Sequence, residues 1–197
     1  MRKPRKRFSC YNTLITDMIT FITGSTGKWK EVSAVLGDFV VQKDIDLPEI
    51  QDLDVKKVVA AKLLEARKVI PKGAILVDDS GYYYHALGRL PGVFSKFFYK
   101  ELGLERNVEL LKKLGDTTVT AYTILGYMDA HDSISYFEAT IECTFVSPRG
   151  TNGFGFDPIF LPAGSDKTAA EMDDTERNKW KMRTIAVKKL KEFLAKK

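Results

Sequence analysis

Apolar and polar residues along the first half of the chain follow two alternating patterns. Short apolar runs at 19–22, 39–41 and 74–77 have the composition of β-strands, and the last is wholly apolar, as in a strand buried on both faces of a sheet. The segments 28–36 and 54–70 carry apolar residues at helical spacing. The sequence therefore predicts alternating strands and helices, the order of an α/β fold.

The pattern changes in the second half of the chain. Segments 93–102 and 105–114, which are divided by Gly103, have the spacing of two more helices. Segments 118–128 and 135–146 are rich in β-branched and aromatic residues and predict the long strands of a hairpin or meander. An α/β part is thus expected to continue into long antiparallel strands.

A closing helix is expected to begin after Asp173. Asp173 and Glu176 have the spacing of a capping box, with Asp in the place of Ser or Thr. Arg183 precedes the apolar residues Ala186 and Val187 by three and four positions, so it lies on the same inward side of the helix. Because a buried arginine requires an anionic partner, we expect either a structural carboxylate or a ligand beside it.

Length and charge indicate the domain organisation. A chain of 197 residues fits one domain with a proper core, or one domain with a small second lobe. The formal charge is +5, but basic side chains near the start, less Asp17, give residues 1–17 a charge of +4 and leave the rest nearly neutral. We expect a basic, flexible N-terminal extension at 1–17 and a single domain at 18–197, to which the resemblance described below assigns a catalytic role.

Composition excludes several classes of protein. The nearly neutral body lacks the basic field of a nucleic-acid-binding domain, so nucleic acid is unlikely as a partner except through the basic extension. No apolar run reaches the roughly 18 residues that a membrane span needs, and the N-terminus lacks the apolar core of a signal peptide. Cys10 and Cys143 have neither a disulfide-framework nor a metal-ligand spacing. These features predict a cytoplasmic protein without a membrane partner.

The turn at 23–28 joins the first predicted strand to the first helix. A strand–turn–helix of this kind directs backbone N–H groups and a helix N-terminus at one point, which suits a phosphate, and Lys28 adds a positive charge. The turn is not a P-loop, because only two residues separate Gly24 from Gly27 and Trp29 replaces the Ser or Thr. The alternative is an ordinary strand–helix connection with glycines for tight geometry.

Carboxylates follow the buried strand at 74–77. Asp78 and Asp79 lie where open α/β sheets place their ligands, and adjacent side chains on extended backbone point in opposite directions. One carboxylate is therefore expected to face a site while the other is structural or reaches a metal through water. With Glu31 and Glu49 they provide enough oxygen ligands for Mg²⁺. The alternative is that the Asp pair caps a turn and Glu49 is solvated.

Aromatic and polar residues elsewhere suit a flat ligand with phosphates. Phe154 and Phe156 stand between glycines, where either ring can stack on a base, and Asp157 can accept hydrogen bonds from the N–H edge of a purine. Ser95 and Lys96 offer a hydroxyl and a cation at the start of a predicted helix. The alternative for the aromatic run is a glycine-kinked strand with core phenylalanines.

Four of these features also match, in the same order, the motifs of a known family. They are the opening turn at 23–31, the acidic loop at 47–51, the Asp-Asp-Ser-Gly and Ala-Leu-Gly-Arg-Leu-Pro-Gly run within 77–92, and the Gly-Phe-Gly-Phe-Asp-Pro run at 153–158. The chain thereby resembles the Ham1-type inosine triphosphate pyrophosphatase family from residue 18 to about residue 194.

The resemblance implies a fold and an activity. It implies an elongated mixed sheet with flanking helices, two lobes around a central cleft, and a homodimer. It also implies Mg²⁺-dependent hydrolysis of non-standard purine nucleoside triphosphates, such as ITP, dITP and XTP, to a nucleoside monophosphate and pyrophosphate.

The resemblance assigns roles to individual residues. The catalytic set would be Asp79, Lys28 and Glu49, with Asp79 orienting or deprotonating the attacking water. The metal ligands would be Glu49, Asp79 and Asp78, of which the family favours Asp79 over Asp78. The residues expected to bind substrate are Thr23, Ser25, Lys28, Ser80, Ser95, Lys96, Phe154, Phe156, Asp157, Arg177 and Arg183.

The sequence departs from the family pattern at its C-terminal helix. Lys181 and Met182 replace the usual Ser and His, and Ser25 replaces an Asn in the opening turn. A methionine cannot donate a hydrogen bond to a base carbonyl, a loss of about 1–3 kcal/mol, or roughly 5- to 150-fold. We expect weaker or altered base discrimination. The alternatives are the same chemistry on a different modified nucleotide, and a nucleotide-binding or RNA-associated protein that is not an enzyme.

Overall fold

A seven-stranded mixed sheet forms the centre of the computed structural model, which describes residues 18–196. The predicted extension at 1–17 lies outside the described residues. The strand order is β2-β1-β3-β5-β6-β7, and β4 pairs with β3 beside this path. The strands are β1 (Ile19–Ile22), β2 (Val40–Lys43), β3 (Ala74–Tyr84), β4 (Pro91–Gly92), β5 (Thr118–Met128), β6 (Ile134–Phe145) and β7 (Phe160–Pro162).

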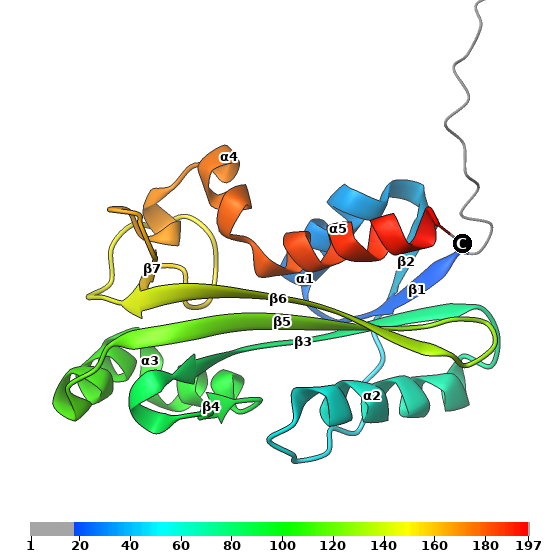
Figure 1. Cartoon of the computed structure of the whole chain (residues 1–197), viewed down its shortest axis with the longest axis horizontal. Helices are drawn as coiled ribbons and strands as arrows, with labels where there is room; N and C mark the ends of the chain where they lie inside the picture. The colour runs from blue at the N-terminus through cyan, green and yellow to red at the C-terminus, as the bar shows by residue number, and fades with distance from the viewer. Residues whose placement is uncertain (1–17, 197) are drawn as a thin grey trace, which may run out of the picture.

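Pairing within the sheet changes from parallel to antiparallel along the chain, as the sequence predicts. β1 pairs in parallel with β2 and β3, whereas β3, β5, β6 and β7 pair antiparallel in sequence. The long strands β3, β5 and β6 run along most of the length of the molecule (Figure 1). The predicted elongated mixed sheet with flanking helices is confirmed.

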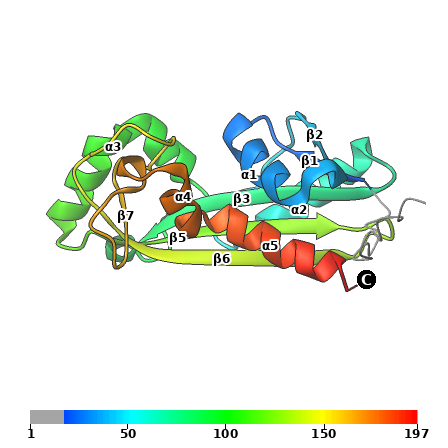
Figure 2. The ribbon, with the colours of Figure 1, turned by 90° about the horizontal axis from the view of Figure 1, so that it is seen from above.

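Helices cover both faces of this sheet. In Figure 1, α1 and α5 lie above the sheet and α2 lies beneath it, and Figure 2 shows α3 at the opposite end of the molecule from the end of α5. Within residues 18–196, the α-helices are α1 (Thr26–Leu36), α2 (Val55–Val69), α3 (Ser95–Leu114), α4 (Asp174–Arg177) and α5 (Met182–Leu194). No helix within residues 18–196 combines the length and the apolar character needed to cross a membrane.

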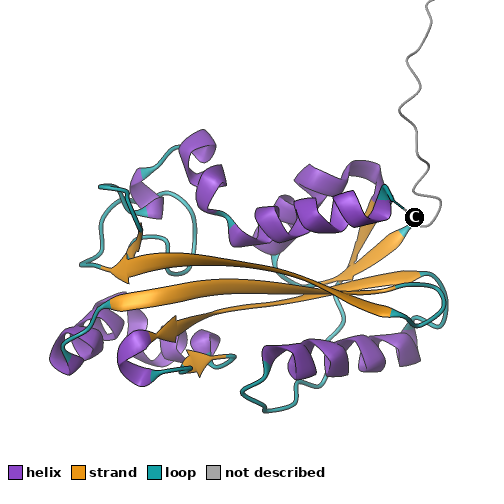
Figure 3. Cartoon of the chain, viewed as in Figure 1, coloured by secondary structure: helices purple, strands orange, loops and turns teal. Residues whose placement is uncertain are grey.

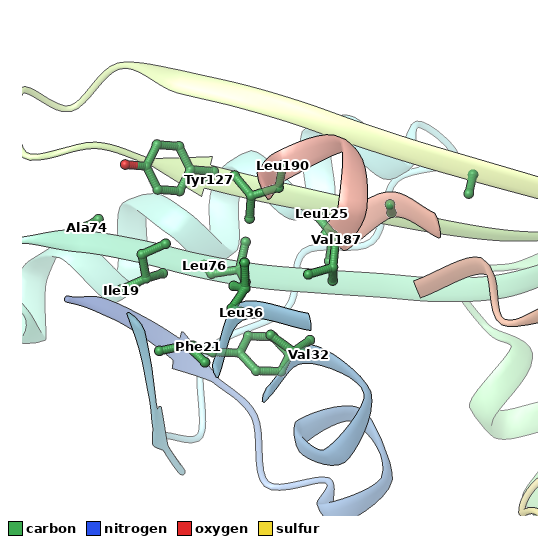
Figure 4. Packing of buried hydrophobic residues seen from close by; sticks show 13 residues of the cluster. Ile19, Phe21, Val32, Leu36, Ala74, Leu76, Leu125, Tyr127, Val187 and Leu190 are labelled. Carbon is green, nitrogen blue, oxygen red and sulfur yellow. The ribbon is translucent and has the colours of Figure 1, made fainter. Parts of the chain in front are cut away.

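Buried side chains hold the helices on the sheet in three clusters. Val32 of α1, Leu76 of β3 and Val187 of α5 meet in the first, where the side chains of the two helices pack onto the strands (Figure 4). The second joins α3 to the strands through Leu111 and Tyr84. The third places α2 against the other face of β3. Both faces of the sheet are thus buried, as the wholly apolar run at 74–77 predicts.

Three elements differ from the sequence prediction (Figure 3). β3 does not end at Val77 but continues to Tyr84, because β5 pairs with it over nearly its whole length. The aromatic run after Gly153 forms turns, and β7 begins only at Phe160. The expected capping box at Asp173 is present, but the short α4 that it caps is separate from α5.

A close approach at Gly126 of β5 brings α2 onto the sheet. A Cβ atom at Gly126 would lie 2.4 Å from Cγ1 of Val59 and 2.9 Å from Cδ1 of Leu63. Both neighbours are buried and belong to α2. The absence of a side chain at this position therefore sets the distance between α2 and the strands.

We expect Gly126→Ala to lower the free energy of unfolding by about 1–3 kcal/mol, because an added methyl group overpacks this contact. Urea denaturation measures the change. The control is the same substitution combined with Val59→Ala, which removes the nearest obstructing atom and is expected to restore part of the loss. Equal losses with and without Val59→Ala would show that the contact does not set the helix position.

Candidate active site

An open edge of β3 forms the floor of the candidate site. β1 pairs with β3 only as far as Phe21 opposite Leu76, and β4 joins the same edge at Gly92 opposite Tyr82. Within the described residues, the stretch 77–81 between these points is paired only on its other side, by β5. Side chains from both faces of the sheet can therefore reach the space that this gap leaves.

A cavity of about 1000 Å³ opens along this edge. Its size suits a ligand as large as a nucleotide. Every side chain that the sequence predicted for catalysis, metal binding or substrate binding lies on its wall: Thr23, Ser25, Lys28, Glu49, Asp78, Asp79, Ser80, Ser95, Lys96, Phe154, Phe156, Asp157, Arg177 and Arg183. The structure thus brings these residues together, and their individual roles stay predictions.

The opening turn places the N-terminus of α1 in the cavity wall. The Ser25 hydroxyl accepts a hydrogen bond from the Lys28 backbone N–H at 3.3 Å and caps the helix. The Thr23 hydroxyl accepts one from the Ser25 N–H at 3.1 Å. Ser25, which departs from the family's usual Asn, therefore keeps a capping side chain at this position. The turn presents a helix N-terminus and the Lys28 ammonium to one end of the cavity.

Asp78 lies at the centre of a buried ion cluster on the α1 and α5 side of the sheet. Its Oδ1 is 3.0 Å from Lys28 Nζ, and its Oδ2 accepts a hydrogen bond from Arg183 Nε at 2.8 Å. Arg183 also donates to Glu31 and, at 3.0 Å, to the Ser80 hydroxyl. Burial alone would raise the pKa of Asp78, but the two cations outweigh it and hold the pKa well below its usual value.

The anionic partner that the sequence required for Arg183 is therefore a structural carboxylate. Asp78 and Glu31 provide it, and the Arg183 side chain is only 8% exposed. Both oxygens of Asp78 are engaged by protein cations. Asp78 thus positions Lys28 and Arg183, and of the three expected metal ligands it is the one with both oxygens paired to protein cations.

Asp79 points to the opposite face of the strand and meets a different cation. Its Oδ1 is 3.0 Å from Lys62 Nζ, which also lies 2.8 Å from Glu49 Oε1, and its Oδ2 accepts a hydrogen bond from the Tyr122 hydroxyl at 3.3 Å. Burial raises the pKa of Asp79 above its usual value, and the Lys62 ammonium only partly opposes this. Asp79 is consequently a stronger base than an exposed carboxylate.

Lys62 is a component of the site that sequence reasoning missed. It lies on α2 and is 8% exposed. Burial disfavours its charge, yet Asp79 and Glu49 outweigh burial and raise its pKa. The same ammonium lowers the pKa of Glu49 against the effect of partial burial. Its position in the apolar stripe of the helix, next to Val58 and Leu63, was a usable signal, identical in kind to the one that identified Arg183.

Aromatic side chains also line the cavity. The Phe154 ring is 54% exposed and lies against Gly27 in the first turn of α1. Phe156 is instead buried, with its ring centroid 5.2 Å from that of Tyr99. Of the two predicted stacking rings, Phe154 is therefore the one free to meet a ligand. Asp157 accepts a hydrogen bond from the Phe154 N–H at 2.8 Å.

Residues around α4 and α5 complete the cavity wall. Burial raises the pKa of Asp157, with Arg177 and Lys181 among the charges that act on it. The Arg177 guanidinium pairs with Asp174 and lines the cavity. Met182 also lies on the wall and packs against two of the buried clusters. The thioether of Met182 thus occupies the cavity wall without an N–H or O–H to donate.

The remaining predicted residues link elements or add charge. The Ser95 hydroxyl donates to the Gly92 carbonyl at 2.6 Å and accepts from the Tyr82 N–H at 2.9 Å. The single proton of this hydroxyl is therefore used to hold α3 against β3 and β4. Lys96, the next residue, contributes its positive charge to the field at Glu49.

The donor set is that of a hard cation held together with an anionic ligand. Within residues 18–196, no group of three or more His, Cys, Asp or Glu side chains is placed to hold a metal by itself. Mg²⁺ typically takes only one or two carboxylates and completes its shell with waters and substrate phosphates. Glu49 and Asp79 fit this requirement. Both lie within 3.0 Å of the Lys62 ammonium, so the two carboxylates are close enough to bind one cation together.

Comparisons with known proteins identify the family of the chain. The model of the Ham1 family matches residues 19–193. The inosine triphosphate pyrophosphatase of Schizosaccharomyces pombe is 38% identical over 183 residues, which are 91% of this chain and 96% of that protein. The dITP/XTP pyrophosphatase of Pyrococcus horikoshii is 34% identical over 179 residues, which are 89% of this chain and 96% of that protein.

A solved structure shares the architecture as well. The Ham1 protein from Coxiella burnetii superposes with a TM-score of 0.76 and 26% sequence identity, covering 91% of this chain and 99% of that chain. Fold and cavity together define an α/β protein with a cavity whose wall carries lysines, carboxylates and aromatic rings. The chain belongs to the Ham1 family.

We expect Asp78→Asn to lower the free energy of unfolding by about 3–5 kcal/mol, because it removes a charge that neutralises buried Arg183. Urea denaturation followed by circular dichroism measures the change. The matched control is Glu138→Gln, which breaks the 2.7 Å pair with Lys56 where both side chains are about half exposed, and for which we expect about 0–1 kcal/mol. Similar losses in the two variants would contradict a stabilising role for the buried cluster.

Proposed function

We propose that the chain is a nucleoside-triphosphate pyrophosphatase that hydrolyses non-standard purine nucleotides, such as ITP, dITP and XTP, to a nucleoside monophosphate and pyrophosphate. One observation carries the proposal: Asp79, a basic carboxylate paired with Lys62, lies on the wall of a nucleotide-sized cavity that also carries the exposed Phe154 ring. Family membership and the names of the relatives from Schizosaccharomyces pombe and Pyrococcus horikoshii support the same reaction.

The triphosphate lies against the cationic groups of the cavity wall. The N-terminus of α1 offers backbone N–H groups, and Lys28 and Lys96 offer ammonium groups. Phosphoryl transfer depends on positioning the reactants and neutralising the charge of the phosphates more than on a strong nucleophile. The purine lies against the exposed Phe154 ring, which stacks on it, and Asp157 accepts from its N–H edge.

Asp79 activates the water. Its raised pKa, which burial causes, makes it a better proton acceptor than an ordinary carboxylate. It takes the proton of a water molecule as the water oxygen bonds to phosphorus and the α–β anhydride P–O bond breaks. Lys62 and Tyr122 hold the two oxygens of this carboxylate in place.

Glu49 and Asp79 would hold Mg²⁺. The ion would neutralise charge on the phosphate oxygens when bound. Asp78, with both oxygens paired to Lys28 and Arg183, keeps the surrounding cations in place. The homodimer and the cytoplasmic location that were expected from the sequence stay predictions.

The first test is the product formed from inosine triphosphate and Mg²⁺. We expect pyrophosphate as the first product, and a loss of about 100-fold or more in kcat for Asp79→Asn, because the general base is removed. The control is Glu138→Gln, an exposed carboxylate outside the cleft, which is expected to leave kcat unchanged. Orthophosphate as the first product, or tight nucleotide binding without turnover, would contradict the proposal.

A second candidate function is the same hydrolysis with altered base preference, because Met182 lines the cavity without a donor group. We expect Met182→His to raise the ratio of kcat/KM for ITP over ATP by roughly 5- to 150-fold, the value of a restored hydrogen bond to the 6-keto oxygen. Met182→Leu, which is also apolar, serves as the matched control and should leave the ratio unchanged. An unchanged ratio in the His variant would show that position 182 does not read the base.

A further inference from the structure

A kink divides α3 into two helical segments. Gly103 has φ 67° and ψ −172° in the interior of the helix, a conformation that glycine adopts without strain. The first segment carries Lys96 and Tyr99 into the cavity wall. The second segment packs into the second of the three buried clusters through Leu111. The angle at Gly103 therefore sets where the cavity-lining side chains of the first segment lie.

Asn107 ties the two segments together from below the kink. It belongs to the second segment and is fully buried, with 0% exposure. Its side-chain amide donates to the Gly103 carbonyl at 2.5 Å and to the Phe98 carbonyl, in the first segment, at 3.1 Å. Both amide protons are thus used to fix the first segment against the second.

The same side chain also connects α3 to the strand that carries the carboxylates. Asn107 Oδ1 accepts a hydrogen bond from the Tyr84 hydroxyl at 2.6 Å. Tyr84 is the last residue of β3 and is fully buried, and its ring meets the Phe98 ring at 5.9 Å between centroids. Asn107 therefore lies where the strand of Asp79 and the helix segment of Lys96 are joined.

We propose that Asn107 is a positioning residue for triphosphate binding: its three hydrogen bonds fix the first segment of α3, and with it Lys96 and Tyr99, relative to β3. The inference rests on the proposed function for its kinetic consequence. Without the amide, the Phe98 carbonyl loses a buried donor. Ser95 still holds the start of the first segment to β3 and β4, whereas the end of this segment next to Gly103 loses its tie to the second segment. The cost falls on ground-state contacts to the substrate, and the water-activating carboxylate of Asp79 is untouched.

The test compares Asn107→Leu with Leu111→Ala in steady-state kinetics with ITP and Mg²⁺. Asn107→Leu is expected to raise KM on the order of tenfold with a much smaller change in kcat, as for the loss of uniform binding. Leu111→Ala, which removes packing in the second segment, leaves KM unchanged. The effect of Asn107→Leu on KM is also measured in a protein that already carries Lys96→Ala. We expect a much smaller effect there, because Asn107 acts on KM through the contact that Lys96 makes with the substrate.

Hydrogen exchange gives a readout that does not depend on turnover. Amides of residues 95–102 are expected to exchange faster in Asn107→Leu and to be unaffected in Leu111→Ala. If Asn107→Leu does not fold, Asn107→Asp keeps the acceptor for Tyr84 and removes the amide donors, and the same results are expected. Unchanged exchange at 95–102 would overturn the inference, as would equal KM changes in the Asn107 and Leu111 variants. A wild-type protein without ITP hydrolysis would refute the proposed function alone.

Discussion

A buried ion cluster around Asp78 is the constraint on which the rest of the structure depends. Burying a carboxylate is costly unless cations and hydrogen bonds compensate it. Lys28 from α1 and Arg183 from α5 provide that compensation, and Glu31 balances the guanidinium. Because these groups come from β3, α1 and α5, satisfying one charge fixes the N-terminus of α1, the start of α5 and the open edge of the sheet relative to one another.

The pleat of β3 directs its two adjacent aspartates to opposite faces of the sheet, where one has a structural role and the other a chemical role. Asp78 faces α1 and α5 and is neutralised, whereas Asp79 faces α2, where Lys62 holds it beside Glu49. Since β1 ends before this point and β4 begins after it, both faces contribute to one cleft. The close approach of α2 at Gly126 then positions Lys62, and the hydrogen bonds of Asn107 position Lys96, relative to the carboxylates of β3. The catalytic arrangement is a consequence of where strands stop as much as of which residues they carry.

Much of this could be predicted from the sequence, and the exceptions have physical reasons. Helical periodicity located α2 and the inward Arg183, and motif order brought together residues that line one cavity. The continuation of β3 past Val77 could not be read, because its next residues are polar and include a glycine and only pairing with β5 keeps them extended. The break between α4 and α5 carries no Pro or Gly signal. Lys62 was within reach of the argument used for Arg183, but a buried Tyr122 in an apolar strand is indistinguishable from an ordinary core residue.

The different roles of the adjacent carboxylates Asp78 and Asp79 are tested most directly by measuring the pKa of each. Carboxyl carbon-13 NMR of the folded protein, with Asp78→Asn and Asp79→Asn used for assignment, follows both groups through a pH titration. The account predicts that Asp78 titrates well below the usual aspartate range, because Lys28 and Arg183 stabilise its charge, and that Asp79 titrates above it, because burial disfavours its charge. Asp78 should thus remain ionised at pH values where Asp79 is already protonated. Overlapping titrations, or the reverse order, would contradict the assignment of Asp78 as the anchor and Asp79 as the base.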